Sequence, residues 1–143
     1  MQPGVIHQVV FLVNMSIIRE QNIRQKSIEQ IAEQMLIAAR TAPKGKGRDT
    51  LEMFIVKKES LSELSSKMHE LGDEYSATFF NRDANNLQKA DAVVVIGTRI
   101  ESLELNEMCQ LCGFENCEEK EKHESIPCVF NTGDLHLAIG SAA

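Results

Sequence analysis

The sequence has few aromatic residues and no long tract of basic ones. It contains no Trp and one Tyr, and aromatic residues make up 5% of its 143 positions. The formal net charge is −6 at pH 7, whereas phosphate neutralisation needs clustered cations, so the composition argues against nucleic acid as a partner. Hydrophobic residues at 43% and charged residues at 25% are typical of a globular protein. The length predicts a single domain.

No hydrophobic run is long enough to cross a membrane. The longest run near the N-terminus is residues 9–13, preceded by Val5 and Ile6, and a membrane-spanning helix needs about 20 apolar residues. A secretory signal would also need a basic region before this run, which is missing. We therefore predict a cytoplasmic protein without a membrane partner. Residues 1–16 are expected to form a strand or an N-terminal extension, with Met15 as an alternative start.

The familiar motifs of catalysis are missing too. The sequence contains no H-E-x-x-H motif and no Walker loop of the form G-x4-G-K-[ST]. No order of Ser, His and Asp indicates a catalytic triad, and no pair of carboxylates indicates acid–base catalysis. The sequence therefore leaves open whether the protein is an enzyme.

Apolar residues that recur every three or four positions predict amphipathic helices. Residues 20–40 carry such a stripe, and a capping box at Ser27 offers a later start as the alternative. A second capping box, Ser60 with Glu63, begins a helix that is expected to end at Gly72.

Two short segments have the composition of buried strands. Residues 53–56 are apolar, and residues 92–97 form a β-branched run without polar alternation. The second run is typical of a central strand covered on both faces. Further helices are expected over residues 81–89 and from Asp134 onward. This succession of helices and strands predicts a layered α/β domain.

All four cysteines fall in one segment, residues 105–130, which separates an α/β scaffold over 17–104 from the C-terminal helix of that scaffold over 131–143. The pattern is C-x2-C-G-x3-C-x10-C, formed by Cys109, Cys112, Cys117 and Cys128. A cubane iron–sulfur cluster needs four converging thiolates. We expect Cys117 to begin a helical turn, and Gly113 to let the chain pass where a Cβ would collide with the cluster.

Two other interpretations of the cysteines compete with a cluster. Zinc also takes four thiolates, but its usual frame is two separated C-x2-C knuckles, and here the second pair is ten residues apart. His123 could enter such a site, although a solvated histidine is the more common case. Disulfides are disfavoured in a cytoplasmic chain. The spacing therefore favours an iron–sulfur cluster.

The cysteine segment resembles the small 4Fe–4S domain of corrinoid-protein and electron-bifurcating complexes, although the last spacing is shorter here. A wider resemblance covers about residues 17–143 and is carried by the segments 38–49, 79–84, 90–97 and 134–142. Through them the chain resembles the uncharacterised ferredoxin-domain proteins of anaerobic bacteria and archaea. This resemblance implies one 4Fe–4S cluster held by the four cysteines and assigns no reaction. Family members continue past the final helix, so the chain is expected to be truncated at its C-terminus.

Four cations surround two glycines in the loop after the first expected helix: Arg40, Lys44, Lys46 and Arg48. Such a loop suits a phosphate. Residues 39–43, Ala-Arg-Thr-Ala-Pro, also resemble the flavin-binding turn of nitroreductases, although residues 44–51 depart from it. The resemblance implies a phosphate or FMN site on a nitroreductase-like scaffold. The alternative is a solvated basic turn with its cations near a helix C-terminus.

Together these patterns predict a ferredoxin-like protein that binds one 4Fe–4S cluster and transfers electrons to a redox partner protein. Four thiolate ligands leave no open iron site, which favours electron transfer. The first alternative is an FMN-dependent oxidoreductase with the cluster as a relay, and the second is a structural zinc module. The acidic run over 115–124 is either a solvated face or a surface that steers a basic partner. A homodimer is left open.

Overall fold

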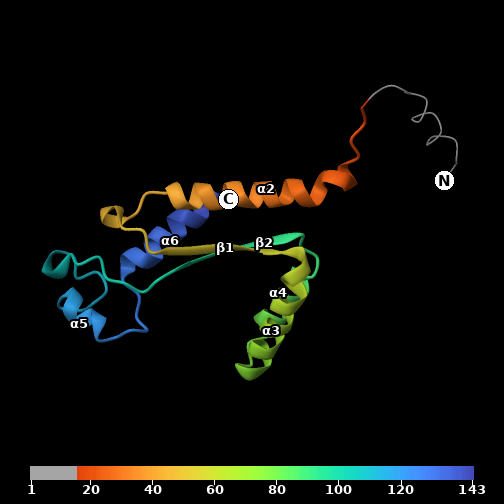
Figure 1. Cartoon of the computed structure of the whole chain (residues 1–143). Helices are drawn as coiled ribbons and strands as arrows, with labels where there is room; N and C mark the ends of the chain where they lie inside the picture. Colours follow the sequence, from red (N-terminus) through yellow and green to blue (C-terminus); the bar gives the residue numbers. More distant parts are fainter. Residues whose placement is uncertain (1–15) are drawn as a thin grey trace.

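A computed structural model describes residues 16–143 (Figure 1). The expected N-terminal strand or extension lies outside the described residues, except for its last position. The protein is a mixed α/β chain with helices α2 Glu20–Thr41, α3 Leu61–Glu74, α4 Thr78–Leu87, α5 Cys117–Glu121 and α6 Val129–Ala142, and strands β1 Leu51–Lys57 and β2 Ala92–Thr98. Over this range, no helix combines the length and the apolar character that a membrane span requires.

Helix α2 confirms the predicted helix and begins at its earlier predicted start, although Ile23 and Ile31 of the apolar stripe are 43% and 57% exposed. The alternative start at Ser27 is wrong, because the helix already runs from Glu20. Arg24, one turn later, forms an ion pair with the Glu20 carboxylate. The negative charge of Glu20 in the first turn also stabilises the helix through its interaction with the helix dipole. Ala32 and Ala39 are the residues of α2 that become fully buried.

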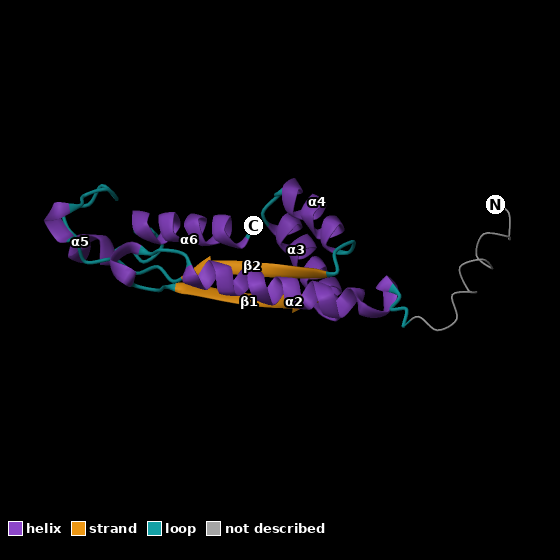
Figure 2. Cartoon of the chain, turned by 90° about the horizontal axis from the view of Figure 1, so that it is seen from above, coloured by secondary structure: helices purple, strands orange, loops and turns teal. Residues whose placement is uncertain are grey.

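The core lies between α2, α6 and one face of the sheet, and Figure 2 shows both helices running along the strands. Its buried members are small or aliphatic: Ala39, Ala42, Leu51 and Ala138. Met53, Ile96, Leu135 and Ala142 pack against them. Three of the four central residues are alanines, so the core where α2 and α6 meet the sheet is built largely from small side chains.

The sheet differs from the prediction of a central strand. β2 pairs antiparallel with β1, from Leu51 opposite Thr98 to Lys57 opposite Ala92. The described chain supplies β2 with this one neighbour, and every residue of β2 stays half-buried. Phe54 of β1 is 55% exposed on the face turned away from α2 and α6. The β-branched run predicted the strand correctly, but it carried no information about how many elements cover it.

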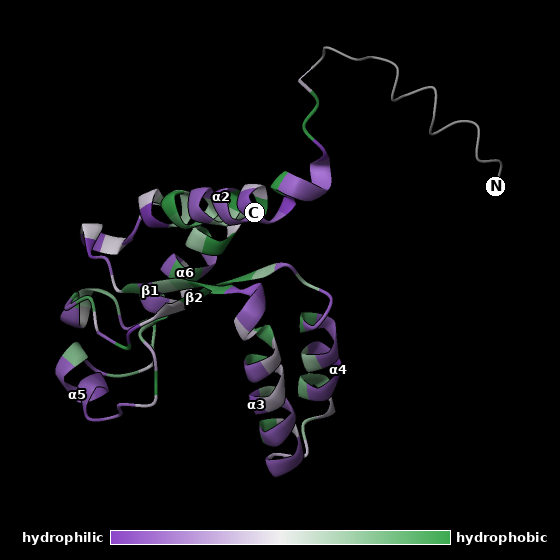
Figure 3. Cartoon of the chain, turned by 45° about the vertical axis from the view of Figure 1, so that its right-hand side comes forward, coloured by the Kyte–Doolittle hydropathy of each residue, from purple (hydrophilic) through white to green (hydrophobic). Residues whose placement is uncertain are grey.

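Helices α3 and α4 form a hairpin that projects from the sheet (Figure 3). Ser60 stands before α3 but makes no capping hydrogen bond with its side chain. The helix also continues past Gly72 to Glu74, so Gly72 does not end it. Its role is close packing, because a Cβ there would lie 2.9 Å from Oδ1 of Asn81 on α4. Helix α4 begins three residues before the predicted 81–89 segment.

Helix α6 begins at Val129, five residues before the predicted start, so that Cys128 is its N-cap. Asn131 in its first turns is 1% exposed. Its Oδ1 accepts a hydrogen bond from the Glu101 N–H at 3.1 Å, and its Nδ2 donates to Thr50 Oγ1 at 3.4 Å. This side chain fastens the segment after β2 to α6, and that segment carries the first cysteines.

Candidate metal centre

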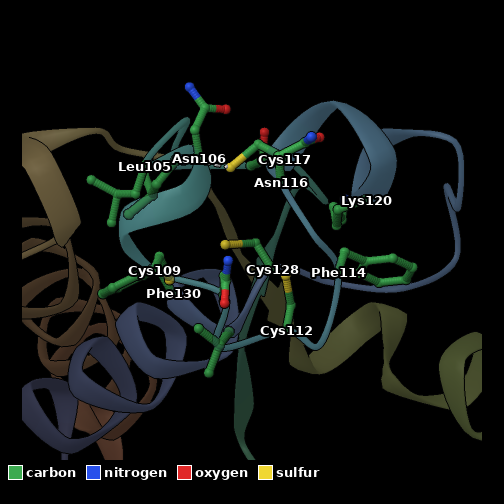
Figure 4. Close-up of a pocket in the computed structure, with 14 residues that line it drawn as sticks. Leu105, Asn106, Cys109, Cys112, Phe114, Asn116, Cys117, Lys120, Cys128 and Phe130 are labelled. Carbon is green, nitrogen blue, oxygen red and sulfur yellow. Dashed lines mark hydrogen bonds between the residues drawn. The ribbon is translucent and has the colours of Figure 1, made fainter.

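The four cysteines line one pocket. The segment around α5 lies at the end of the sheet away from the α3–α4 hairpin (Figure 1). Figure 4 shows the cysteines around a common space, with the sulfur atoms of Cys117 and Cys128 pointing into it. All four are free thiols, and Cys128 is buried while the others are half-buried. The cavity between them measures about 10 Å³, which is room for about one water molecule. The predicted ligands are therefore brought together.

Each cysteine is positioned by a turn or a helix terminus. Cys109 directly follows the 3-10 turn η3 Asn106–Met108, and Cys112 lies in the next turn. Cys117 is the first residue of α5, as predicted. That helix is capped by Asn116, whose Oδ1 accepts from the Glu119 N–H at 2.9 Å. The backbone N–H of Asn106 donates to Cys117 Sγ at 3.3 Å, so a peptide dipole already points at one sulfur.

Left-handed backbone conformations concentrate in the cysteine segment and at the residue just before it. Glu104, Asn106 and Gln110 have φ of 55°, 47° and 49°, and Gly113 has φ of 82°. Left-handed conformations of non-glycine residues cost about 1–3 kcal/mol each and cluster at ligand clamps. A Cβ on Gly113 meets no protein atom within 4 Å, so its positive φ is what favours glycine here. The expected collision between a Cβ and a cluster stays a prediction.

Lys120 also lines this pocket, and it is the feature that the sequence interpretation missed. Its side chain is 1% exposed, and its Nζ atom is buried without a hydrogen-bond partner. A carboxylate oxygen, Oε1 of Glu121, lies 3.6 Å away on a half-exposed side chain. That oxygen already accepts the Ser102 N–H at 2.8 Å. A buried cation with so little compensation is unfavourable unless an anion lies near it.

Hydrogen bonds and charge act together on Glu121. Hydrogen bonds from the Ser102 side chain and backbone, assisted by the positive charge of Lys120, outweigh partial burial and hold the pKa of Glu121 below its usual range. Glu121 is therefore a carboxylate engaged with the backbone of the segment after β2. Its charge compensates Lys120 in part.

The candidate ligand side chains of the described residues do not point to a common position for a single metal ion. Over residues 16–143, no group of three or more His, Cys, Asp and Glu side chains is close enough together to hold one metal ion. His123, the alternative zinc ligand, does not line the pocket. Its ring stacks on Phe114 with the centroids 4.9 Å apart.

Each of the four cations of the basic loop has hydrogen-bond partners within the protein. Arg40 donates to the Leu51 carbonyl at 3.2 Å. Lys44 Nζ donates to the carbonyls at the end of α2, including that of Arg40 at 2.6 Å. Lys46 Nζ donates to the Leu103 carbonyl at 2.9 Å, and Arg48 to that of Ser102 at 3.1 Å. A phosphate or FMN role for these residues stays a prediction.

In the structure the loop connects the scaffold to the segment that precedes the cysteines. Lys46 and Arg48 hold the two residues before Glu104 by their carbonyls. The Gly45 N–H donates to both carboxylate oxygens of Asp134 on α6, at 3.1 and 3.0 Å. Lys44 lies at the C-terminus of α2, as the alternative expects, but its side chain is 5% exposed and therefore not solvated. The basic loop therefore connects α2, α6 and the segment that leads to Cys109.

Asp49 gives this loop a testable pH dependence. Partial burial raises the pKa of its carboxyl, but hydrogen bonds from Arg40 and the Leu51 N–H, with the charges of Lys44 and Arg40, outweigh burial and bring it below the ordinary 3.8. Asp49→Asn is expected to lower the free energy of unfolding by about 1 kcal/mol at pH 7.

The sign of the pH dependence follows from the lowered pKa. The stabilisation is complete above pH 3.8, and it is lost as the pH falls through the lower pKa of the folded state. Urea unfolding at pH 7 and pH 3 should show the difference between wild type and Asp49→Asn shrinking in acid. Glu59→Gln, an exposed carboxylate, is the control. Equal stabilities at pH 7 would contradict the role of Asp49.

A sequence signal for Lys120 exists, although it is weak. Lys120 follows Cys117 by three residues, and α5 is helical over both positions. Residues three apart share a helix face, so a cation there faces the same side as the ligand. The acidic residues around it in the sequence made a solvated side chain the simpler expectation.

Comparisons with known proteins give a relative without an assigned function. The chain is 33% identical to an uncharacterised protein of Archaeoglobus fulgidus over 133 residues, an alignment that covers 88% of this chain and 71% of that protein. No protein-family model matches the chain, and no solved structure matches it. The resemblance to ferredoxin-domain proteins therefore stays a prediction. By the extent of the shared sequence, the chain belongs to the same family as this archaeal protein.

Proposed function

We propose that this protein binds one 4Fe–4S cluster through Cys109, Cys112, Cys117 and Cys128 and transfers electrons one at a time. One observation carries the proposal: the four thiols line a single pocket together with a buried amino group that has no hydrogen-bond partner. Thiolates are the ligands that such clusters require. An anionic group in the pocket would also compensate the buried cation.

The lining of the pocket suits a redox centre. When bound, the cluster supplies a site that accepts and releases one electron at a time. The four cysteines fill its ligand positions, and the Asn106 N–H stabilises negative charge on Cys117 Sγ. Leu105, Phe114 and Phe130 surround the sulfurs with apolar surface, which limits the access of water and is one determinant of cluster potential.

The size of the cavity sets a condition on loading. A volume of about 10 Å³ is too small for an iron–sulfur cage, so the turns between Leu105 and Gly113 must move outward when it binds. These turns are held by short-range bonds, such as Met108 N–H to the Leu105 carbonyl at 3.2 Å.

A structural zinc site is less well supported than a cluster. Zinc draws its sulfurs to about 2.3 Å from one point, and no three candidate ligands of the described chain approach a common point. The preference for a cluster rests on the cysteine spacing, in which the second pair does not form a C-x2-C knuckle.

The distribution of charge supports a basic redox partner. Residues 101–124 contain eight Glu and two Lys, while the remaining residues contain thirteen acidic and thirteen basic ones. The whole formal charge of −6 therefore belongs to the segment that carries the first three cysteines. Such a field accelerates encounters with a positively charged surface. The proposal also places the protein in a reducing cytoplasmic compartment, where four free thiols persist. It further includes a nitroreductase-like scaffold into which the Cys-rich segment is inserted.

Anaerobic purification tests the proposed function. We expect a brown protein with about four iron and four acid-labile sulfide per chain, and an electron paramagnetic resonance signal after one-electron reduction. Protein with stoichiometric zinc and no sulfide would contradict the proposal and support the structural zinc module. Released yellow flavin would add the FMN-dependent alternative.

A further inference from the structure

We propose that Lys120 is the charge-compensating residue of the cluster pocket and sets the reduction potential of the cluster. This inference rests on the proposed function. It assigns a role to a side chain that is 1% exposed and whose Nζ atom has no hydrogen-bond partner. Lys120 lines the same pocket as the four cysteines, and the close-up places it beside them (Figure 4).

The physical argument starts from the cost of burying charge. An ionised amino group taken out of water is costly by several kcal/mol unless an opposite charge compensates it. Glu121 compensates it only in part, because its Oε1 lies 3.6 Å from Nζ, is half exposed and is already bound by the Ser102 N–H. The four cysteines are the groups of this pocket that become anionic when a cluster binds.

The same charge must then affect reduction. A cluster held by four thiolates is an anion, and it becomes more negative when it accepts an electron. A fixed positive charge in a low-dielectric pocket stabilises the reduced form more than the oxidised form. Lys120 therefore raises the potential, and its removal lowers it.

The neighbouring Lys122 provides a matched control. It is two residues away on the same segment, but its side chain is 63% exposed and pairs with Glu119 at 2.6 Å. Both substitutions, Lys120→Met and Lys122→Met, remove one positive charge. Because solvent screens exposed charges, only the first is expected to act strongly on the cluster.

The test is a redox titration of the loaded proteins, with iron and sulfide measured in each. We expect Lys120→Met to lower the midpoint potential clearly more than Lys122→Met does. Equal shifts in two fully loaded variants would overturn the inference and leave the proposed function intact. Wild-type protein that takes up no iron and sulfide would overturn both.

A variant that loads poorly also decides the question. Lys120→Met that is folded by circular dichroism but retains less cluster than Lys122→Met supports a need for the buried charge. Lys120→Met that cannot fold even without iron would overturn the inference, because Lys120 would then stabilise the protein by itself.

Discussion

Replacing Cys112 with alanine is expected to leave a folded protein that retains little or no iron–sulfur cluster. Cys112 lies in the turn between Cys109 and Gly113, and it lines the pocket without belonging to the core between α2, α6 and the sheet. Its loss removes one of four thiolates. Mutating residues that merely support the ligands weakens metal binding by about 10–100-fold. The loss of a ligand itself should therefore lower cluster content at least tenfold.

The adjacent Leu111 offers a control for this variant. Leu111 is 65% exposed and belongs to the same turn, so Leu111→Ala alters the turn without removing a sulfur. Iron, acid-labile sulfide and visible absorbance are measured in both variants after anaerobic purification, with circular dichroism to check folding. A Cys112→Ala protein with the iron and sulfide content of Leu111→Ala would remove Cys112 from the ligand set.

The positions of helices and strands could be predicted from the sequence better than the elements that pack against them. The stripe over residues 20–40 identified α2, because helical periodicity is a local property. The β-branched run over 92–97 identified β2 but not its single neighbour, since the number of strands beside it depends on distant parts of the chain. Gly72 illustrates the same limit. A glycine after a helical stripe suggests a helix end, but here it admits Asn81 of α4.

The candidate site was predictable where covalent spacing controls it. The C-x2-C spacing places Cys109 and Cys112 on successive turns. The position of Cys117 at the start of α5 follows from the acidic helical residues that come directly after it in the sequence. The approach of Cys128 depends on α6 packing on α2, which spacing alone does not determine. The cations of the basic loop lie close together in the sequence, but in the structure each donates to a different backbone carbonyl. Their separate partners could not be predicted from sequence proximity.

The burial of Lys120 leads to a second large effect, in the protein without iron. Lys120→Met is expected to stabilise the iron-free protein, because the substitution replaces a poorly compensated buried cation with an apolar side chain of similar length. Replacing buried ionic groups by apolar ones stabilises proteins by about 1–4 kcal/mol. The partial compensation by Glu121 places the expected gain towards the lower end. Urea denaturation or a rise of several degrees in Tm measures it.

This stabilisation should depend on the occupant of the pocket. In the loaded protein the anionic centre compensates Lys120, so the advantage of Lys120→Met over wild type should shrink or reverse. Lys122→Met serves again as the control, and it should change stability little with or without iron because its side chain is solvated. Iron-free Lys120→Met that is less stable than wild type would show that the Lys120 amino group is already compensated within the protein. The argument from its burial would then fail, whatever the pocket binds.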